Sequence, residues 1–222
     1  MTAAIAPPLR VIAIGDSSVY GYGDPEGGGW VERLRRHCMA AGPEAPVIYN
    51  LGVRGDGTHQ VARRLSTEFA CRGELRNRQP DRLLISVGIN DSPRVGKPEG
   101  RNRLPYDDFC LEFASLMEKA RSLAPTLCIG MVPVNEAAMP FAEVLWYSLE
   151  EQRRYRTASR DICDRFGIPY LDLLALWESR GSSWWQARLS TDGLHPNSLG
   201  YADLYADIQT WEPLQRSLGL AT

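Results

Sequence analysis

The chain has 222 residues, of which 44% are hydrophobic and 23% are charged, an ordinary composition for a soluble globular protein. Its formal net charge of −2 gives no electrostatic reason to expect nucleic-acid binding. Because a chain of this length can bury one sizeable core, we expect a single domain over residues 1–222.

The sequence predicts neither a targeting segment nor a membrane segment. The first expected strand begins within about ten residues, whereas a signal peptide needs at least ~15, and no stretch approaches the ~18 apolar residues of a membrane span. We therefore expect a cytoplasmic protein, whose oligomeric state the sequence leaves open. Five cysteines, expected to be reduced and mostly buried, form no CxxC pair and no His–Cys cluster with zinc-ligand spacing, so we expect no metal and no cofactor. They are Cys38, Cys71, Cys110, Cys128 and Cys163.

Strands and helices are predicted to alternate along the chain. The run 9–14 is rich in β-branched residues and ends at Gly15, which is typical of a strand buried on both faces of a parallel sheet. The glycine-rich segment 19–29 then predicts a loop, but it has neither the dinucleotide-binding nor the P-loop spacing. Further strands are predicted at 46–51, 81–88, 126–132 and 168–171, and helices at 30–41, 58–77, from Pro105, at 143–166 and after Asn197. This alternation predicts a parallel sheet with helices on both faces.

Three segments between or after these elements carry further expectations. A long basic loop, residues 92–105, holds Arg94, Lys97, Arg101 and Arg103 against a single Glu99, and loops of this length are usually functional or mobile. These cations could favour an anionic leaving group, although solvated charges are the default. Residues 172–191 are expected to be irregular. The last helix is expected to present an apolar face made of Leu199, Leu204, Tyr205, Ile208 and Trp211.

Three residues that are suited to chemistry follow the ends of predicted strands. They are Ser17, Gly52 and Asn90, and the carboxyl ends of parallel strands meet at one edge of a sheet, so these residues can converge. A serine there can be a nucleophile if a base reaches its hydroxyl, and an ordinary turn after a strand is the alternative. The N–H groups of Ser17 and Gly52 and the side-chain amide of Asn90 are candidate donors to a tetrahedral oxyanion. A turn glycine and a turn asparagine are the alternatives.

Asp192 and His195 are the candidate acid and base. They are three residues apart, a spacing that lets a carboxylate hold one imidazole nitrogen while the other faces a serine hydroxyl. The alternative is an Asx turn followed by a surface histidine. For His59, near the start of a predicted helix, we expect a surface or cleft-rim position without a chemical role.

These residues lie in four short motifs, and together the motifs resemble those of the SGNH-hydrolases, also called the GDSL esterase/lipase family. The family blocks are named for Ser, Gly, Asn and His, and here they appear in family order from the first strand to the final loop. Ser18 stands where the family usually has leucine, a position without a catalytic role. The matching motifs are Gly15-Asp16-Ser17, Asn50-Leu51-Gly52, Gly88-Ile89-Asn90-Asp91 and Asp192-Gly193-Leu194-His195-Pro196.

The resemblance implies a flavodoxin-like three-layer α/β/α sandwich around a five-stranded parallel sheet. It also implies hydrolysis of carboxylic esters or thioesters of small molecules by a Ser17–His195–Asp192 triad and an acyl-enzyme. Ser17, Gly52 and Asn90 would form the oxyanion hole. An acyltransferase or a carbohydrate acetylesterase would use the same residues, and a non-catalytic binding protein of this fold is a further alternative. Four aromatic residues could line an acyl or sugar site but are more often core or interface: Trp146, Tyr147, Trp184 and Trp185.

Overall fold

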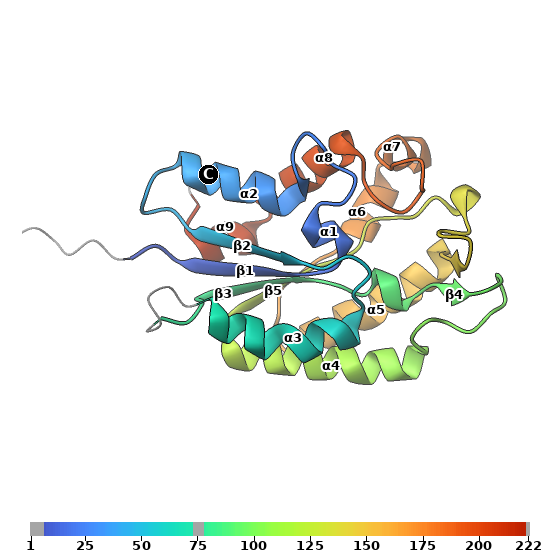
Figure 1. Ribbon diagram of the computed structural model, residues 1–222, viewed down its shortest axis with the longest axis horizontal. Coiled ribbons are helices and arrows are strands. Elements are labelled where there is room, and N and C mark those ends of the chain that lie inside the picture. Colours follow the sequence, from blue (N-terminus) through green and yellow to red (C-terminus); the bar gives the residue numbers. More distant parts are fainter. Residues whose placement is uncertain (1–6, 73–77, 221–222) are drawn as a thin grey trace, which may run out of the picture.

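The computed structural model describes residues 7–72 and 78–220, and its centre is a five-stranded sheet in which every neighbouring pair of strands is parallel (Figure 1). The strand order is β2-β1-β3-β5-β7, which is the flavodoxin-like order, so the predicted fold is confirmed. The strands are β1 (Arg10–Gly15), β2 (Val47–Gly52), β3 (Arg82–Ser86), β5 (Thr126–Ile129) and β7 (Tyr170–Leu171).

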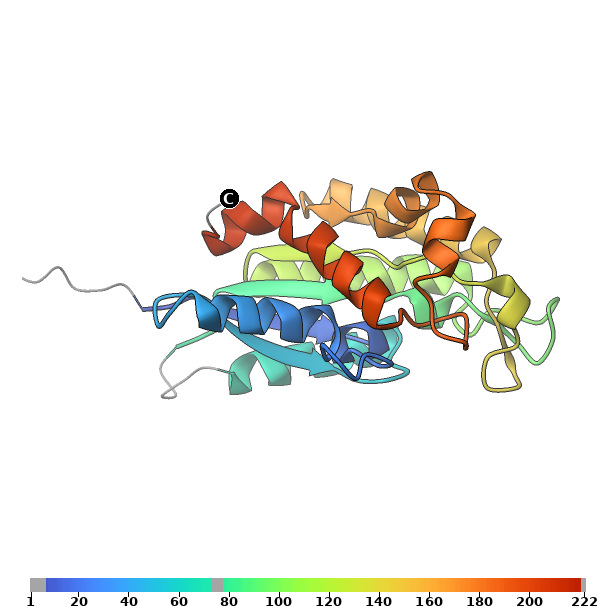
Figure 2. The ribbon, with the colours of Figure 1, turned by 90° about the horizontal axis from the view of Figure 1, so that it is seen from above.

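The central strands bury both of their faces, and a layer of helices covers each face (Figures 1 and 2). In β1, Val11 and Ala13 join one core cluster while Ile12 and Ile14 join the other, because successive side chains point to opposite sides of a sheet. One layer contains α2 (Gly29–Ala40), α6 (Leu173–Ser179), α7 (Ser182–Gln186), α8 (Ser198–Gln209) and α9 (Glu212–Leu218). The other contains α3 (Thr58–Cys71), α4 (Tyr106–Leu123) and α5 (Leu149–Arg165).

The helix predicted at 143–166 begins later in the structure, at Leu149. Ala142 and Glu143 have positive φ, which no helix of L-residues tolerates, and Leu145 pairs with Val95. Ser148 then caps α5, since its hydroxyl accepts a hydrogen bond from the Glu151 N–H. The residues ahead of α5 instead form β6 (Leu145–Trp146), which pairs antiparallel with β4 (Arg94–Val95) of the basic loop.

Other boundaries also differ from the predictions. Segment 172–191 is not irregular but holds α6 and α7, and the Asp172 side chain caps α6 by accepting from the Ala175 N–H. The final helical region is split into α8 and α9, with Trp211 between them, and Leu199 is 53% exposed rather than part of an apolar face. The helix predicted to reach Asn77 ends at Cys71, and residues 73–77 lie outside the described residues.

The described cysteines are all free, and Cys38, Cys128 and Cys163 are buried, whereas Cys110 is half-buried and Cys71 exposed. Within residues 7–72 and 78–220, no helix combines the length and the apolar character that crossing a membrane requires. The carboxyl ends of the five strands lie at one edge of the sheet, and the loops that leave this edge carry the candidate residues.

Candidate active site

Ser17 lies just beyond the end of β1, at the first position of the short helix α1 (Ser17–Tyr20). The Asp16 carboxylate caps this helix by accepting a hydrogen bond of 2.8 Å from the Ser18 N–H. Gly15 lets the end of β1 lie this close to β3, because a Cβ at this position would lie 1.9 Å from the Ser86 carbonyl oxygen. Among the described residues, the Ser17 N–H has no acceptor, as is usual for a first helical position.

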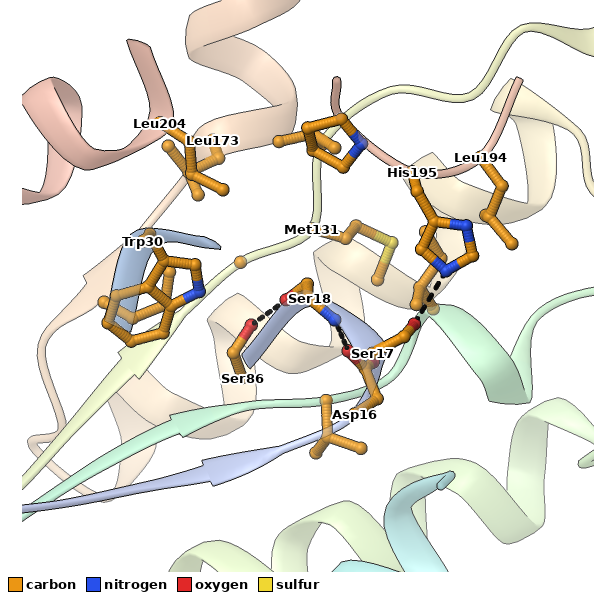
Figure 3. A pocket seen from close by; sticks show the side chains of 16 residues that line it. Asp16, Ser17, Ser18, Trp30, Ser86, Met131, Leu173, Leu194, His195 and Leu204 are labelled. Atoms are coloured by element: carbon orange, nitrogen blue, oxygen red, sulfur yellow. Dashed lines mark hydrogen bonds between the residues drawn. The ribbon is translucent and has the colours of Figure 1, made fainter. Parts of the chain in front are cut away.

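Ser17, His195 and Asp192 form a continuous chain of hydrogen bonds, of which Figure 3 shows the one between Ser17 and His195. The Ser17 Oγ lies 2.8 Å from His195 Nε2, and His195 Nδ1 lies 2.7 Å from Asp192 Oδ2. Since the carboxylate accepts from Nδ1–H, Nε2 is left to accept the serine proton. Ser17 and His195 are each only 6% exposed. The structure therefore brings Ser17 together with Asp192 and His195, which lie far from it in the sequence, in the order hydroxyl, imidazole and carboxylate.

The Asp192 carboxylate is held in its ionised form. Burial acts to raise its pKa, but hydrogen bonds from the His195 side chain and from the backbone N–H groups of His195 and Leu194 outweigh burial, so the pKa is lowered. The two backbone donors lie 3.0 and 2.9 Å from Oδ1. This Asx turn, which was the alternative interpretation of the motif, is thus present, and it fixes the carboxylate against the imidazole.

Two other carboxyl groups at this edge of the sheet are buried and have the opposite tendency. Burial raises the pKa of Asp16 to about 7, although the Ser18 N–H and the nearby His195 act to lower it. Burial likewise raises the pKa of Asp91 to about 6, although the hydroxyl and N–H of Thr58 both donate to that carboxylate. Asp16 and Asp91 therefore favour the neutral form far more than an exposed aspartate does.

Asn90 is held on both sides of its amide. It lies in a short 3-10 helix, Ile89–Asp91, that follows β3, and it is buried. Its Nδ2 donates to the Asp56 carbonyl over 3.0 Å, and its Oδ1 accepts from the Tyr147 hydroxyl over 3.0 Å. An amide nitrogen has two hydrogens, so one donor remains. Tyr147, whose side chain is buried beside β6, was expected only as a possible lining residue, and nothing in the sequence connects it with Asn90.

Gly52 lies at the end of β2 and pairs with Gly15 of β1. The contacts of Gly52 are those of a residue that packs strands and loops together. Its N–H already donates to the Asn50 side chain over 3.0 Å, and a Cβ there would lie 2.1 Å from the Tyr20 nitrogen. Further along the same loop, Gly55 has an N–H without an acceptor among the described residues, and its carbonyl accepts from Arg103 over 2.9 Å. The sequence motif named Gly52 as the donor and did not include Gly55. The backbone of Gly55 has a φ of +80°, which glycine adopts readily.

Aromatic rings flank the imidazole. Tyr22 and Phe141 meet the His195 ring edge-on, with centroid distances of 4.6 and 5.8 Å, and the Arg54 guanidinium lies 3.9 Å above the Tyr22 ring. Neither aromatic residue belongs to a sequence motif. His59 contacts Glu112 at 3.4 Å and is half-exposed, in agreement with a position without a chemical role.

One cation of the basic loop and two of the aromatic candidates have structural partners. Arg94 pairs with Glu151 at 2.5 Å and is therefore not a free surface charge. Trp184 and Trp185 lie on α7 and pack against the core on the α2 face of the sheet, and Trp184 meets Trp177 edge-on.

A model of the GDSL-like Lipase/Acylhydrolase family matches residues 13–202, a span that includes all of the motif residues. Among solved structures, a lipase/acylhydrolase from Enterococcus faecalis is 22% identical and has a TM-score of 0.71, with 90% of this chain and 93% of that chain covered. A catalytic mutant of Axe2, an acetylxylan esterase from Geobacillus stearothermophilus, is 16% identical with a TM-score of 0.68 over 99% and 98% of the two chains. The esterase EstA from Pseudoalteromonas, inhibited by monoethylphosphonate, is 19% identical with a TM-score of 0.64 over 90% and 94%. A search of curated proteins gives no significant match.

Proposed function

Because the chain belongs to the GDSL-like lipase/acylhydrolase family and is thus a hydrolase acting on esters, we propose that Ser17 is its nucleophile, in a triad with His195 and Asp192. The observation that carries this proposal is the unbroken chain of hydrogen bonds from Ser17 Oγ through the imidazole to the Asp192 carboxylate. All three groups stand at the carboxyl edge of a parallel sheet, where open α/β folds bind their ligands.

The proposed reaction has two halves. Ser17 Oγ forms a bond to the carbonyl carbon of the ester while its proton passes to His195 Nε2, and the carbonyl electrons move to oxygen. The tetrahedral intermediate collapses as the bond to the alcohol oxygen breaks, and that oxygen takes the proton from Nε2. Water then attacks the acyl-enzyme, giving its proton to His195, and the acid leaves as Ser17 regains the proton.

The oxyanion requires donors that are already in position. We propose the Ser17 N–H and the free hydrogen of Asn90 Nδ2, whose amide is fixed by Asp56 and Tyr147. The Gly52 N–H would first have to break its hydrogen bond to Asn50 Oδ1. Of the three donors expected from the sequence, Gly52 therefore contributes least to stabilising the oxyanion. The Gly55 N–H needs no such exchange and is the alternative donor from the same loop.

The test is ester turnover by matched serine variants. We expect Ser17→Ala to abolish nearly all hydrolysis of p-nitrophenyl acetate and butanoate while the unfolding temperature stays close to that of the wild type. Ser122→Ala, on the exposed side of α4, is the matched control and should keep full activity. Retention of near-normal turnover by Ser17→Ala would refute the proposed nucleophile. Product analysis with added alcohol separates hydrolysis from acyl transfer.

A further inference from the structure

The structure contains a mainly apolar pocket that adjoins Ser17 and extends toward α2 and α8 (Figure 3). Its cavity volume is about 30 Å³, roughly the space of two ordered water molecules, so it suits a short chain and not a long one. Its apolar wall includes Ile129, Met131, Val132, Leu173 and Leu204. These five residues lie outside the motifs found in the sequence.

Polar groups stand among these apolar side chains. Trp30, at the start of α2, is fully buried, and its Nε1–H has no hydrogen-bond partner within the described part of the chain. In Figure 3 the indole nitrogen lies on the ring edge that is turned toward Ser18 and Ser86. The hydroxyls of these two serines lie 3.5 Å apart, at the limit of a hydrogen bond, so each retains capacity for another partner.

An unpartnered indole N–H in such a pocket favours a particular kind of occupant. The N–H is only a donor, so an oxygen acceptor satisfies it, whereas a methylene group at the same point leaves it without a partner. The charge of the occupant is also constrained. No Lys or Arg is among the described residues that line the pocket, while Asp16 is, so a carboxylate would gain no counter-charge there. The acceptor is therefore a neutral oxygen.

The chemistry of the reaction indicates which half of the ester enters. The acyl group stays bonded to Ser17 through both halves of the reaction, whereas the alcohol must depart and be replaced by water. A pocket that adjoins Ser17 and is lined by buried side chains therefore suits the acyl group.

We propose that this pocket binds the acyl group and selects short acyl chains that carry a neutral ether, keto or hydroxyl oxygen, with Trp30 Nε1–H as the donor that recognises it. The proposal rests on the proposed function, since it requires an acyl group on Ser17. The Ser18 and Ser86 hydroxyls serve as additional polar contacts for the same oxygen.

The experiment compares isosteric esters that differ by one oxygen. p-Nitrophenyl 3-methoxypropanoate is paired with pentanoate, and methoxyacetate with butanoate, and each kcat/KM is divided by the rate of alkaline hydrolysis of the same ester. For the wild type we expect a corrected preference of about 3–10-fold for the oxygen-bearing chain in at least one pair, the range of one neutral hydrogen bond. Trp30→Phe, which keeps an aromatic ring but lacks the N–H, should abolish that preference.

Two further variants make the test independent of how Trp30→Phe folds. Ser86→Ala removes one hydroxyl from the pocket and should reduce the preference, while its backbone carbonyl still accepts from the Asp16 N–H. Trp177→Phe is the matched control, because its Nε1–H donates to Asp207 outside the pocket, and it should keep the preference. Equal corrected rates in both pairs, or a preference unchanged in Trp30→Phe and Ser86→Ala, would overturn the pocket proposal alone. Ester turnover that is unaffected by Ser17→Ala would instead overturn the proposed function.

Discussion

At the scale of single residues, the contact that most affects the proposed chemistry is the one between Tyr147 and Asn90. The hydroxyl of Tyr147 fixes the Asn90 amide so that Oδ1 is occupied and Nδ2 is left to donate. Tyr147→Phe removes this constraint without removing the ring. We expect kcat to fall by about 3–10-fold, the effect of one neutral hydrogen bond, with KM nearly unchanged, because an oxyanion donor acts mainly in the transition state.

A double-variant cycle distinguishes positioning from a general loss of packing. In an Asn90→Ala background, Tyr147→Phe should cost little further activity, because the amide that it positions is already absent. Tyr155→Phe is the matched control, since this buried tyrosine donates to the Leu104 carbonyl instead. Full additivity of Tyr147→Phe and Asn90→Ala would show that Tyr147 does not act through Asn90.

The proposed role of Asn90 as an oxyanion donor is testable by two substitutions, one that removes the amide and one that replaces it with a carboxylate. Asn90→Ala should lower kcat by about 10²–10³, the usual cost of one lost oxyanion donor. Asn90→Asp should be at least as harmful, because it puts a negative charge beside the developing oxyanion, even though aspartate suits turns as well as asparagine does. Steady-state kinetics with unfolding curves as the folding control decide this, and a fully active Asn90→Asp enzyme would remove Asn90 from the site.

At the scale of elements, a partly buried ion pair joins β4 to α5. Arg94 bonds Glu151 and the Gly100 carbonyl, and the Glu151 side chain is 4% exposed while that of Arg94 is 34% exposed. Arg94→Ala leaves the buried Glu151 carboxylate with one ion-pair partner among residues 7–72 and 78–220, Arg154, 3.8 Å away. We expect a loss of about 2–4 kcal/mol in the free energy of unfolding, below the range for fully buried pairs because Arg94 is partly solvated.

The same ion pair predicts an asymmetry that urea unfolding can measure. Glu151→Gln removes the charge that is costly to bury and leaves Arg94 with partial access to water, so it should cost less than Arg94→Ala. Arg153→Ala breaks an exposed pair with Glu178 and should cost no more than about 1 kcal/mol. A larger loss for Glu151→Gln than for Arg94→Ala would contradict this account.

Whether a segment is a helix or a strand was predictable wherever its apolar pattern was long. The predicted boundaries were wrong where a capping residue or a pairing with a distant segment sets the end of the element. The five strands follow from apolar runs that end in glycine or loop residues. The start of α5 was wrong because the apolar pattern continues through Leu145 and Trp146, which pair with β4 instead. Ser148 and Glu151 have the spacing of a capping box, and this local signal marks the true start.

The site divides in the same way. The contact of Ser17 with His195, and of His195 with Asp192, was predictable because each residue stands in a local motif. The surroundings of Tyr147 and Trp30 were not predictable, because they depend on which side chains each meets across the fold, and no spacing in the sequence encodes that. Gly52 shows the limit of motif matching, since its N–H already has a partner that only the structure reveals.

At the scale of the whole molecule, the buried carboxyl group of Asp16 makes stability depend on pH. Its pKa is raised from 3.8 to about 7, so between these values the folded state binds more protons than the unfolded state. Its contribution to stability is therefore complete below about pH 4 and is lost as the pH rises toward 7. The loss amounts to as much as about 4 kcal/mol at ~1.4 kcal/mol per unit.

Asp16→Asn tests this linkage, because the amide oxygen can still accept from the Ser18 N–H and cannot ionise. Unfolding curves between pH 4 and pH 7.5 should show a smaller decline for the variant than for the wild type. Asp91, whose pKa is also raised, titrates in both proteins, so the difference between them reports Asp16 together with its electrostatic interaction with Asp91. Identical pH dependence in the two proteins would mean that Asp16 does not titrate in this range.

The central claim is that Ser17 is a nucleophile activated by His195, and covalent trapping tests it most directly. The full chain is treated with a fluorophosphonate, and intact mass and peptide mapping locate the adduct over time. We predict a single adduct on Ser17, none in Ser17→Ala, and much slower labelling in His195→Ala, where the base that takes the proton is absent. An adduct at another residue, or equal labelling of wild type and Ser17→Ala, would contradict the account.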